Sequence, residues 1–558
     1  MNKLIIKNGL IYDPLTNIEG EKKDILVESG KIVDKFSNES DIKEIDATGK
    51  AVIPAATDIH THVASQQINW VRLLGYYNKV FQEVWQGLTL EGIARAYISM
   101  GYTFILEANV FPSLAKQTIF NFQQIPVLDK GMLLNVSNFW PLEVEFQRGK
   151  IDDMAIFISD LLSKTKGFGL KVYNPFECEN WNFKSLREDL ATQGRLYNFS
   201  ALDVYENIVK CVEKLGLPHS AHAHIEAYEN NEGKENLFKV LDRINSLGLA
   251  NNLSNRTDFK RSQILHLAHL NSYCMDGDNS KLINYLNESS HFTSDLSFLG
   301  FNKINPIITS DRRLIQSKIT MNIISNPYKL ITSAVEFEGD SFVSLRTMDK
   351  ANYHACILWA NALELALNIK SQNQLSLSLN FPNYANISDI PQIATWLISK
   401  EARESLMKGM NDKFLKNTNL FSLEKELTFF EFISISRANP AKALGLGRIK
   451  GTLGLEADAD INIIDIDPQN LDLSKEYEKF QLAMNRIDYV IKAGKIVKKQ
   501  NNIDLNSEGL IFWSEGHSKE EEKDFILSKK QEFYNKYSSI FYDSIQDSID
   551  SKLLRKID

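Results

Sequence analysis

The sequence of 558 residues has little cysteine, no long apolar run and no excess of positive charge. Its four cysteines, Cys178, Cys211, Cys274 and Cys356, are far apart and form no Cys-x-x-Cys pair. This spacing argues against a disulfide framework, a thiolate zinc site and an iron–sulfur cluster, and it favours a reducing cytoplasm. Without a run of about 18 apolar residues, no membrane span is predicted. The net charge of −8 gives no basic surface for nucleic acid.

Short strands are predicted near both ends of the chain. Residues 1–52 alternate apolar and polar side chains, with Asn-Gly and Ser-Gly pairs as turns. A similar pattern returns between 448 and 502. We therefore predict one small β-sandwich domain that combines 1–52 with 448–502.

The middle of the chain, 53–447, alternates strand-like and helix-like segments. Helices are predicted for 90–100, after Thr89 as a cap, and for 202–215, after Ser200 as a cap. This alternation favours a (β/α)8 TIM-like barrel, and a doubly wound open sheet is the alternative. The eight candidate strands are residues 51–59, 103–109, 131–138, 168–174, 217–224, 262–270, 291–299 and 374–381.

Two segments depart from this alternation. The spacer of about 300–373, which contains Asp311 and the stretch 335–338, is long. On the carboxyl side of a barrel it would supply substrate contacts, or it is a plain insertion. The segment 503–558 is charged, and apolar residues recur every four positions from Tyr537 to Leu553. This stripe predicts a helical extension that docks on a partner chain or packs on its own barrel.

Histidines gather on three of the predicted strands. His60 and His62 follow the first apolar run, and their spacing places both imidazoles on one side of a strand, where they can bind one metal ion. A pair of surface histidines is the alternative for this motif alone. However, seven of the ten histidines share such positions, and burying so many imidazoles needs many hydrogen-bond partners. The seven are His60, His62, His219, His222, His224, His266 and His269.

Several motifs together resemble the amidohydrolase superfamily. They are closest to the A component of formylmethanofuran dehydrogenase and of the related formyltransferase/hydrolase complexes. The resemblance covers most of residues 1–470. The stretches that carry it are Ala-Thr-Asp-Ile-His-Thr-His at 56–62, Leu-Lys-Val-Tyr-Asn-Pro at 170–175, Leu-Pro-His-Ser-Ala-His-Ala-His at 217–224, and the segments 363–367, 394–403 and 437–446.

The resemblance implies a centre of two divalent metal ions, expected to be zinc. In it, His60 and His62 would bind the first metal, and His222 and His266 the second. Lys171, carboxylated on its amine, would bridge the two. Such a pair of metals lowers the pKa of a shared water and polarises the carbonyl under attack.

Other positions would complete the site. The resemblance favours His222 over His224 as the ligand, because Leu-Pro-x-x-x-His is the family's general spacing on strand five. It leaves His224 and Asn174 as expected substrate contacts.

Strand eight departs from the family pattern. Asn380 stands where the family has an aspartate that binds metal and accepts a proton from the attacking water, and Phe381 follows where the family has histidine. An amide is a negligible base near neutral pH, and loss of a general base typically costs about 10²–10⁴ in rate. Either another group, His269 or Asp311, serves as the base, or the chain has lost turnover.

The resemblance implies hydrolysis or formation of the N-formyl amide of a methanofuran-type one-carbon carrier, with formate as product or substrate. It also implies a cytoplasmic complex with other subunits, which would supply any redox chemistry. Two alternatives stay open. The chain could be a catalytically impaired scaffold of the same complex, or an amidohydrolase acting on another amide.

Overall fold

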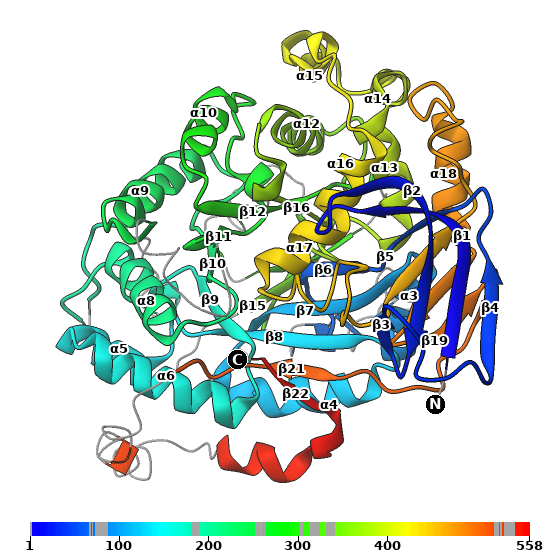
Figure 1. Ribbon diagram of the computed structural model, residues 1–558. Coiled ribbons are helices and arrows are strands. Elements are labelled where there is room, and N and C mark those ends of the chain that lie inside the picture. The colour runs from blue at the N-terminus through cyan, green and yellow to red at the C-terminus, as the bar shows by residue number, and fades with distance from the viewer. Residues whose placement is uncertain are drawn as a thin grey trace.

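The computed structural model describes most of the chain and places two sheets side by side (Figure 1). A ten-stranded sheet forms the barrel and its extension, and a nine-stranded sheet lies beside it. The residues that the structure describes are 3–65, 68–69, 71–72, 88–177, 179, 189–195, 197–250, 261, 263–301, 305–309, 311, 314, 324–330, 341–517, 524, 527–528 and 542–557.

Eight parallel strands form the barrel, in chain order. Each pairs with the next, and a parallel bridge between Thr61 and Phe381 links the first strand to the segment after the last. The predicted (β/α)8 barrel is therefore confirmed, and the open-sheet alternative is wrong. The strands are β6 (Ala56–Thr61), β7 (Tyr102–Val110), β8 (Asp129–Asn135), β9 (Gly169–Tyr173), β10 (Ala221–His224), β11 (Leu265–Leu267), β12 (Phe292–Ser297) and β16 (Leu375–Ser378).

Helices cover the outside of the barrel (Figure 1). Both predicted caps are present: Thr89 accepts from Gly92 N–H, and Ser200 forms a capping box with Asp203. No helix among the described residues is both long and apolar enough to cross a membrane. The main helices are α3 (Leu90–Ser99), α4 (Ala115–Gln124), α6 (Ile151–Thr165), α8 (Ala201–Leu215), α9 (Gly233–Asn245), α10 (Ser280–Glu288) and α12 (Tyr353–Asn368).

The nine-stranded sheet is built from both ends of the chain. Its two halves meet where β5 pairs with β1 in parallel and with β17 antiparallel. The predicted strand 51–59 is in fact two strands, β5 and β6, which separate at Ala55 and enter different sheets. The strands are β1 (Lys3–Asp13), β2 (Ile18–Glu28), β3 (Lys31–Val33), β4 (Ile42–Asp46), β5 (Ala51–Pro54), β17 (Ile461–Ile464), β18 (Tyr489–Lys492), β19 (Lys495–Lys499) and β20 (Asn502–Ile503).

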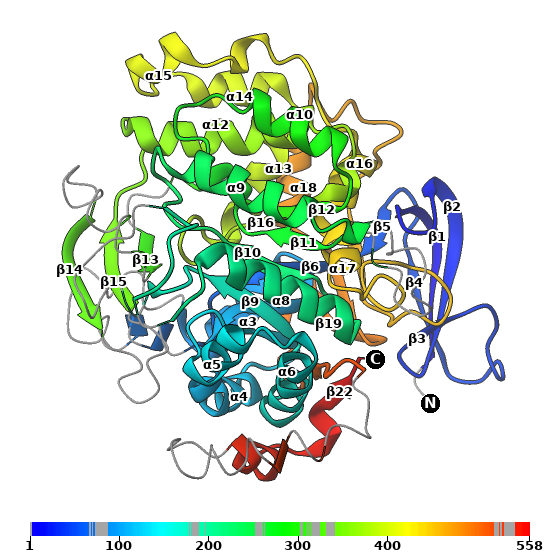
Figure 2. The same ribbon diagram turned by 90° about the vertical axis from the view of Figure 1, so that its left-hand side faces the viewer.

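The long spacer between the last two barrel strands forms a sheet of its own. It consists of β13 (Asn305–Thr309), β14 (Ile324–Leu330) and β15 (Ser341–Arg346), and we call it the insertion sheet. In Figure 2 it lies on the opposite side of the barrel from β1 and β2. The stretch 335–338 lies outside the described residues.

The C-terminal segment returns to the barrel. Strand β21 (Ile511–Trp513) pairs in parallel with β8 and with β22 (Leu554–Lys556). The described part of the predicted helix forms 3-10 turns, and Ile545 and Ile549 are buried in the core. Tyr537 lies outside the described residues. The described part thus packs on its own barrel.

A buried ion cluster joins these parts of the chain. Lys450, only 1% exposed, places Nζ 2.6 Å from carboxylate oxygens of Asp129 and Asp460 and 2.9 Å from Asp458. Arg555 of β22 contacts Asp458 at 2.6 Å. Barrel, nine-stranded sheet and C-terminal segment therefore share one network of charges.

Replacing Lys450 with methionine is expected to lower the free energy of unfolding by about 3–5 kcal/mol, because three buried carboxylates would lose their shared cation. Urea-induced unfolding measures this loss. The control is Lys475→Met at an exposed pair with Asp472, where no measurable change is expected. Equal stability of the two variants would show that the cluster contributes little.

Candidate metal centre

The barrel brings its polar side chains together at the carboxyl ends of the strands, where sites in such barrels are built. Strand register explains part of this arrangement. His222 of β10 lies directly opposite Lys171 of β9 on one side and opposite His266 of β11 on the other. Residues in register on adjacent parallel strands have their side chains on the same face of the sheet. The three side chains therefore form a row across the inner face of the barrel.

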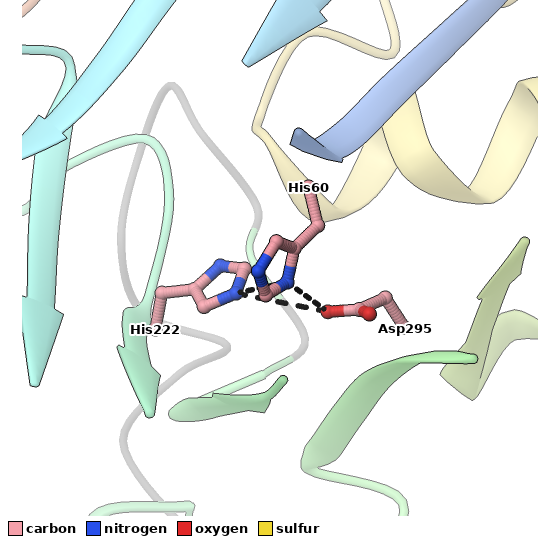
Figure 3. Close-up of side chains that lie close together, drawn as sticks. All are labelled: His60, His222 and Asp295. Atoms are coloured by element: carbon pink, nitrogen blue, oxygen red, sulfur yellow. Dashed lines mark hydrogen bonds and ion pairs between the residues drawn. The ribbon is translucent and has the colours of Figure 1, made fainter. Parts of the chain in front are cut away.

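A group with metal-ligating potential lies at the centre of the barrel (Figure 3). It consists of His60, His222 and Asp295, whose ligand atoms all lie within 4.8 Å of one another. Asp295 Oδ2 is 3.0 Å from His60 Nδ1 and 3.7 Å from His222 Nε2. His266 Nε2 is 3.4 Å from the same oxygen. One carboxylate oxygen thus faces three imidazoles from three strands.

Neighbouring groups hold these imidazoles in place. His266 Nδ1 lies 2.9 Å from Thr293 Oγ1, and His62 Nδ1 lies 3.3 Å from Glu107. His219 does not face the centre directly. Its Nδ1 lies 2.7 Å from the Ala443 carbonyl and its Nε2 3.2 Å from His222. Such contacts fix ring orientation, as the outer partners of metal ligands do.

The electrostatics favour neutral imidazoles. Burial, together with the charge of Lys171, holds the pKa values of His60 and His222 well below the ordinary histidine value. Burial alone would raise the pKa of Asp295, but His60 and His266 beside it hold that pKa well below its usual range. Neutral imidazole and ionised carboxylate are the forms that bind metal.

Lys171 is buried at the same place. Its Nζ has no hydrogen-bond partner among the described residues. Burial lowers its pKa to about 7, and Asp295 and Glu107 oppose that shift only in part. An unsatisfied buried amine is costly, so the residues present fit a bound group at this position. A neutral amine is also the form that can combine with carbon dioxide to give a carbamate.

A small cavity of about 30 Å³ opens beside these residues, with room for a water molecule. Strands β6, β9, β10 and β13 and the segment after β16 all contribute to its wall. The lining residues are His60, His62, Asn109, Lys171, Tyr173, His224, Tyr228, His269, Ile308, Thr309, Asn380 and Asn383.

Of the other predicted site residues, His224 and His269 line this cavity, with His269 Nε2 2.7 Å from His224 Nδ1. Burial lowers the pKa of His269 to about 3, which makes it a weak proton acceptor near neutral pH. Asp311 and Asn174 are buried but do not line the cavity. The two oxygens of Asp311 accept from backbone N–H groups of Ala227 and Leu314.

Two acidic residues near the site were not predicted from the sequence. Asp295 lies on β12, where an acid within an otherwise buried strand was the available signal. Glu107 on β7 accepts from the backbone N–H groups of residues 63–65 at 2.7–3.1 Å. It therefore fixes the backbone immediately after His62.

Comparison with known proteins identifies relatives that resemble this chain in sequence. The family model described as "Amidohydrolase family" matches residues 382–498. The protein FwdA of Methanocaldococcus jannaschii is 28% identical over 551 residues, covering 96% of this chain and 95% of that protein. The A component of the formyltransferase/hydrolase complex Fhc of Methylorubrum extorquens is 23% identical over 516 residues, covering 88% and 89%. The resemblance seen in the sequence motifs is thereby confirmed.

A solved structure has the same fold. It is a chain of the formyltransferase/hydrolase complex FhcABCD from Methylorubrum extorquens, crystallised in complex with methylofuran. The TM-score is 0.84 at 20% sequence identity, and the match covers 100% of this chain and 99% of the other. The composite sheet, the barrel and the C-terminal return all lie within that match.

Proposed function

We propose that this chain, which is similar over nearly its whole length to FwdA and to the A component of Fhc, is a metal-dependent hydrolase for an N-formyl amide. The substrate would be a formylated carrier of the methanofuran type, and formate the product, or the reverse. The observation that carries this proposal is the convergence of His60, His222, His266 and Asp295 beside Lys171, whose amine has no hydrogen-bond partner within the described part of the chain.

The ligands expected from the sequence could hold two divalent metals, expected to be zinc. His60 and His62 would hold one, His222 and His266 the other, and carboxylated Lys171 would supply the shared oxygens. When bound, two such metals activate water as a nucleophile and polarise a carbonyl.

The chain's own residues would prepare the site. Its walls are buried, so they exclude bulk water and strengthen every charge interaction inside. Asp295 orients His60 and His266 through one oxygen, while its other oxygen accepts from the backbone N–H of His269 at 3.0 Å. Its Oδ2 faces His60, His222 and His266. Both oxygens of Asp311 accept from backbone N–H groups instead, which makes Asp295 the better candidate for a carboxylate that acts in the site.

The proposal extends to partner subunits, because one relative belongs to a complex. The Fhc relative is part of the complex FhcABCD, which was crystallised with methylofuran. We expect this chain to assemble with further subunits of such a complex and to meet a furan-bearing carrier. Any electron transfer would belong to those subunits, because the chain offers no cysteine cluster for an iron–sulfur centre.

A specific observation favours a second candidate. The segment after β16 contains Asn380 and Phe381 and so carries no carboxylate at the position where the family resemblance places one. A chain that binds metal and partners without turnover would explain this change. The third possibility, an amidohydrolase acting on another amide, is tested by the choice of substrate.

The decisive assay compares metal-free and zinc-loaded protein on N-furfurylformamide, a minimal formyl amide that carries a furan ring. We expect formate release from the zinc-loaded chain and only background release after chelation. Acetamide and hydantoin serve as amides of other classes. Zinc-loaded protein that binds metal but releases no formate would favour the scaffold, and hydrolysis of another amide alone would favour the third possibility.

A further inference from the structure

A chain of three hydrogen-bonding groups fixes the side chain of Asn380. The backbone N–H of Ile308, on the insertion sheet, donates to Asn383 Oδ1 at 2.9 Å. Asn383 Nδ2 in turn donates to Asn380 Oδ1 at 3.0 Å. A backbone N–H can only donate, so it sets which end of Asn383 faces it. That orientation then requires Asn380 to present its oxygen to Asn383.

The backbone places Asn380 at the rim of the metal centre. Its φ of +43° is left-handed, a conformation that asparagine tolerates. Its N–H donates to Ser378 Oγ at 3.2 Å, and Ser378 Oγ donates to the carbonyl of His60 at 2.9 Å. Asn380 is thus tied to the strand that carries the first histidine ligand.

One polar atom of Asn380 is then left over. Its oxygen is engaged by Asn383, and no acceptor contacts Nδ2 among the described residues. The side chain is 4% exposed and lines the same cavity as His60, His62 and Lys171. The remaining N–H groups are therefore available to a molecule in that cavity.

We propose that Asn380 is a catalytic residue that donates a hydrogen bond from Nδ2 to the formyl oxygen of the substrate, with Asn383 as its positioning residue. This inference rests on the proposed function. Water adds to the formyl carbon, and the formyl oxygen gains negative charge. The C–N bond then breaks, the amine nitrogen takes the proton that the attacking water loses, and formate leaves. A donor aimed at that oxygen stabilises the charge as it develops, whereas a carboxylate would repel it.

The absence of a carboxylate at position 380 then reflects a different role for this position: it donates a hydrogen bond. Asp295, on the neighbouring strand, already supplies a carboxylate to the histidines. A second carboxylate at position 380 would add negative charge to the place where the substrate develops its own. The amide instead supplies a donor that Asp295 cannot.

The insertion sheet also holds the positioning residue from a second side. Arg346 of β15 donates from Nη2 to the backbone carbonyl of Asn383 at 2.7 Å. Arg346 is itself paired with Glu229 at 2.9 Å. Two strands of the insertion sheet therefore fix the residue that sets the orientation of Asn380.

The most selective test is Asn383→Asp. The new carboxylate still accepts from Ile308 N–H but no longer donates, so Asn380 should turn its amide and present Oδ1 to the cavity. With zinc content unchanged, we expect kcat for N-furfurylformamide to fall about 10²–10³-fold, the usual cost of losing one such donor, with KM changed far less. Asn380→Asp should show the same loss.

The matched control is Asn386→Asp, the same chemical change at an exposed helix cap that retains its acceptor oxygen. It should behave as wild type. Wild-type kcat in Asn383→Asp, or faster turnover in Asn380→Asp, would overturn the proposal. In the latter case the asparagine at position 380 would simply have lost the function of the family's aspartate.

A binding readout separates this inference from the proposed function. If zinc-loaded wild type releases no formate, the proposed function fails, and calorimetric titration with N-furfurylformamide decides the role of Asn380. Binding about tenfold weaker in Asn383→Asp would support the donor. Equal binding, or none to wild type, would overturn it.

Discussion

Replacing Asp295 with asparagine is expected to lower formate release by about 10²–10⁴-fold and to weaken zinc binding about 10–100-fold. One oxygen of this buried carboxylate lies within 3.0–3.7 Å of nitrogens of three histidines. An amide keeps the shape but removes the negative charge that would balance the metals. Steady-state kinetics and zinc titration against a chelator measure the two effects.

Asp311→Asn provides the comparison for Asp295. Both carboxylate oxygens of Asp311 accept from backbone N–H groups, and the residue does not line the cavity. Its substitution is expected to leave zinc affinity unchanged. If instead Asp311→Asn abolished turnover while Asp295→Asn did not, the base would be Asp311 and the role given to Asp295 would be wrong.

Replacing Lys171 with methionine is expected to abolish formate release and, in metal-free protein, to stabilise the fold by about 1–3 kcal/mol. The amine is fully buried and has no hydrogen-bond partner among the described residues. A thioether of similar length removes the unsatisfied group together with the expected carbamate. Urea-induced unfolding after chelation and the formate assay give the two results.

Lys130→Met is the matched control for this change. Lys130 is also buried on a barrel strand, but its Nζ donates to the carbonyl of Gly509 at 3.3 Å. Here methionine should lower stability, because that carbonyl loses its donor. A loss of stability in Lys171→Met as large as in Lys130→Met would mean that the Lys171 amine is satisfied in the folded chain.

The barrel could be predicted because its signals are local. Apolar runs ending in histidine mark strands one, five and six, and Thr89 and Ser200 mark helix starts. The break at Ala55 could not be predicted, because an uninterrupted apolar run enters two sheets, and only three-dimensional pairing separates them. The C-terminal apolar stripe predicted a helix, but the described part follows the barrel surface in 3-10 turns.

The candidate site was predictable only in part. Spacing and family resemblance pointed to His60, His62, Lys171, His222 and His266. Asp295 has no neighbouring motif, and its place among three histidines depends on the register of β10, β11 and β12. The orientation of Asn380 depends on Ile308, whose partner Asn383 lies 75 positions further along the chain. Such contacts exist only after the insertion sheet has folded.

The zinc content of the purified full chain after reconstitution, measured by elemental analysis, tests the proposed metal centre. About two zinc ions per chain are expected, as for other paired-metal hydrolases. About one or fewer are expected in His222→Ala, which removes an expected ligand of the second metal that also lies beside His60 and Asp295. A chain that resists zinc reconstitution would contradict the metal centre and, with it, the proposed hydrolysis of a formyl amide.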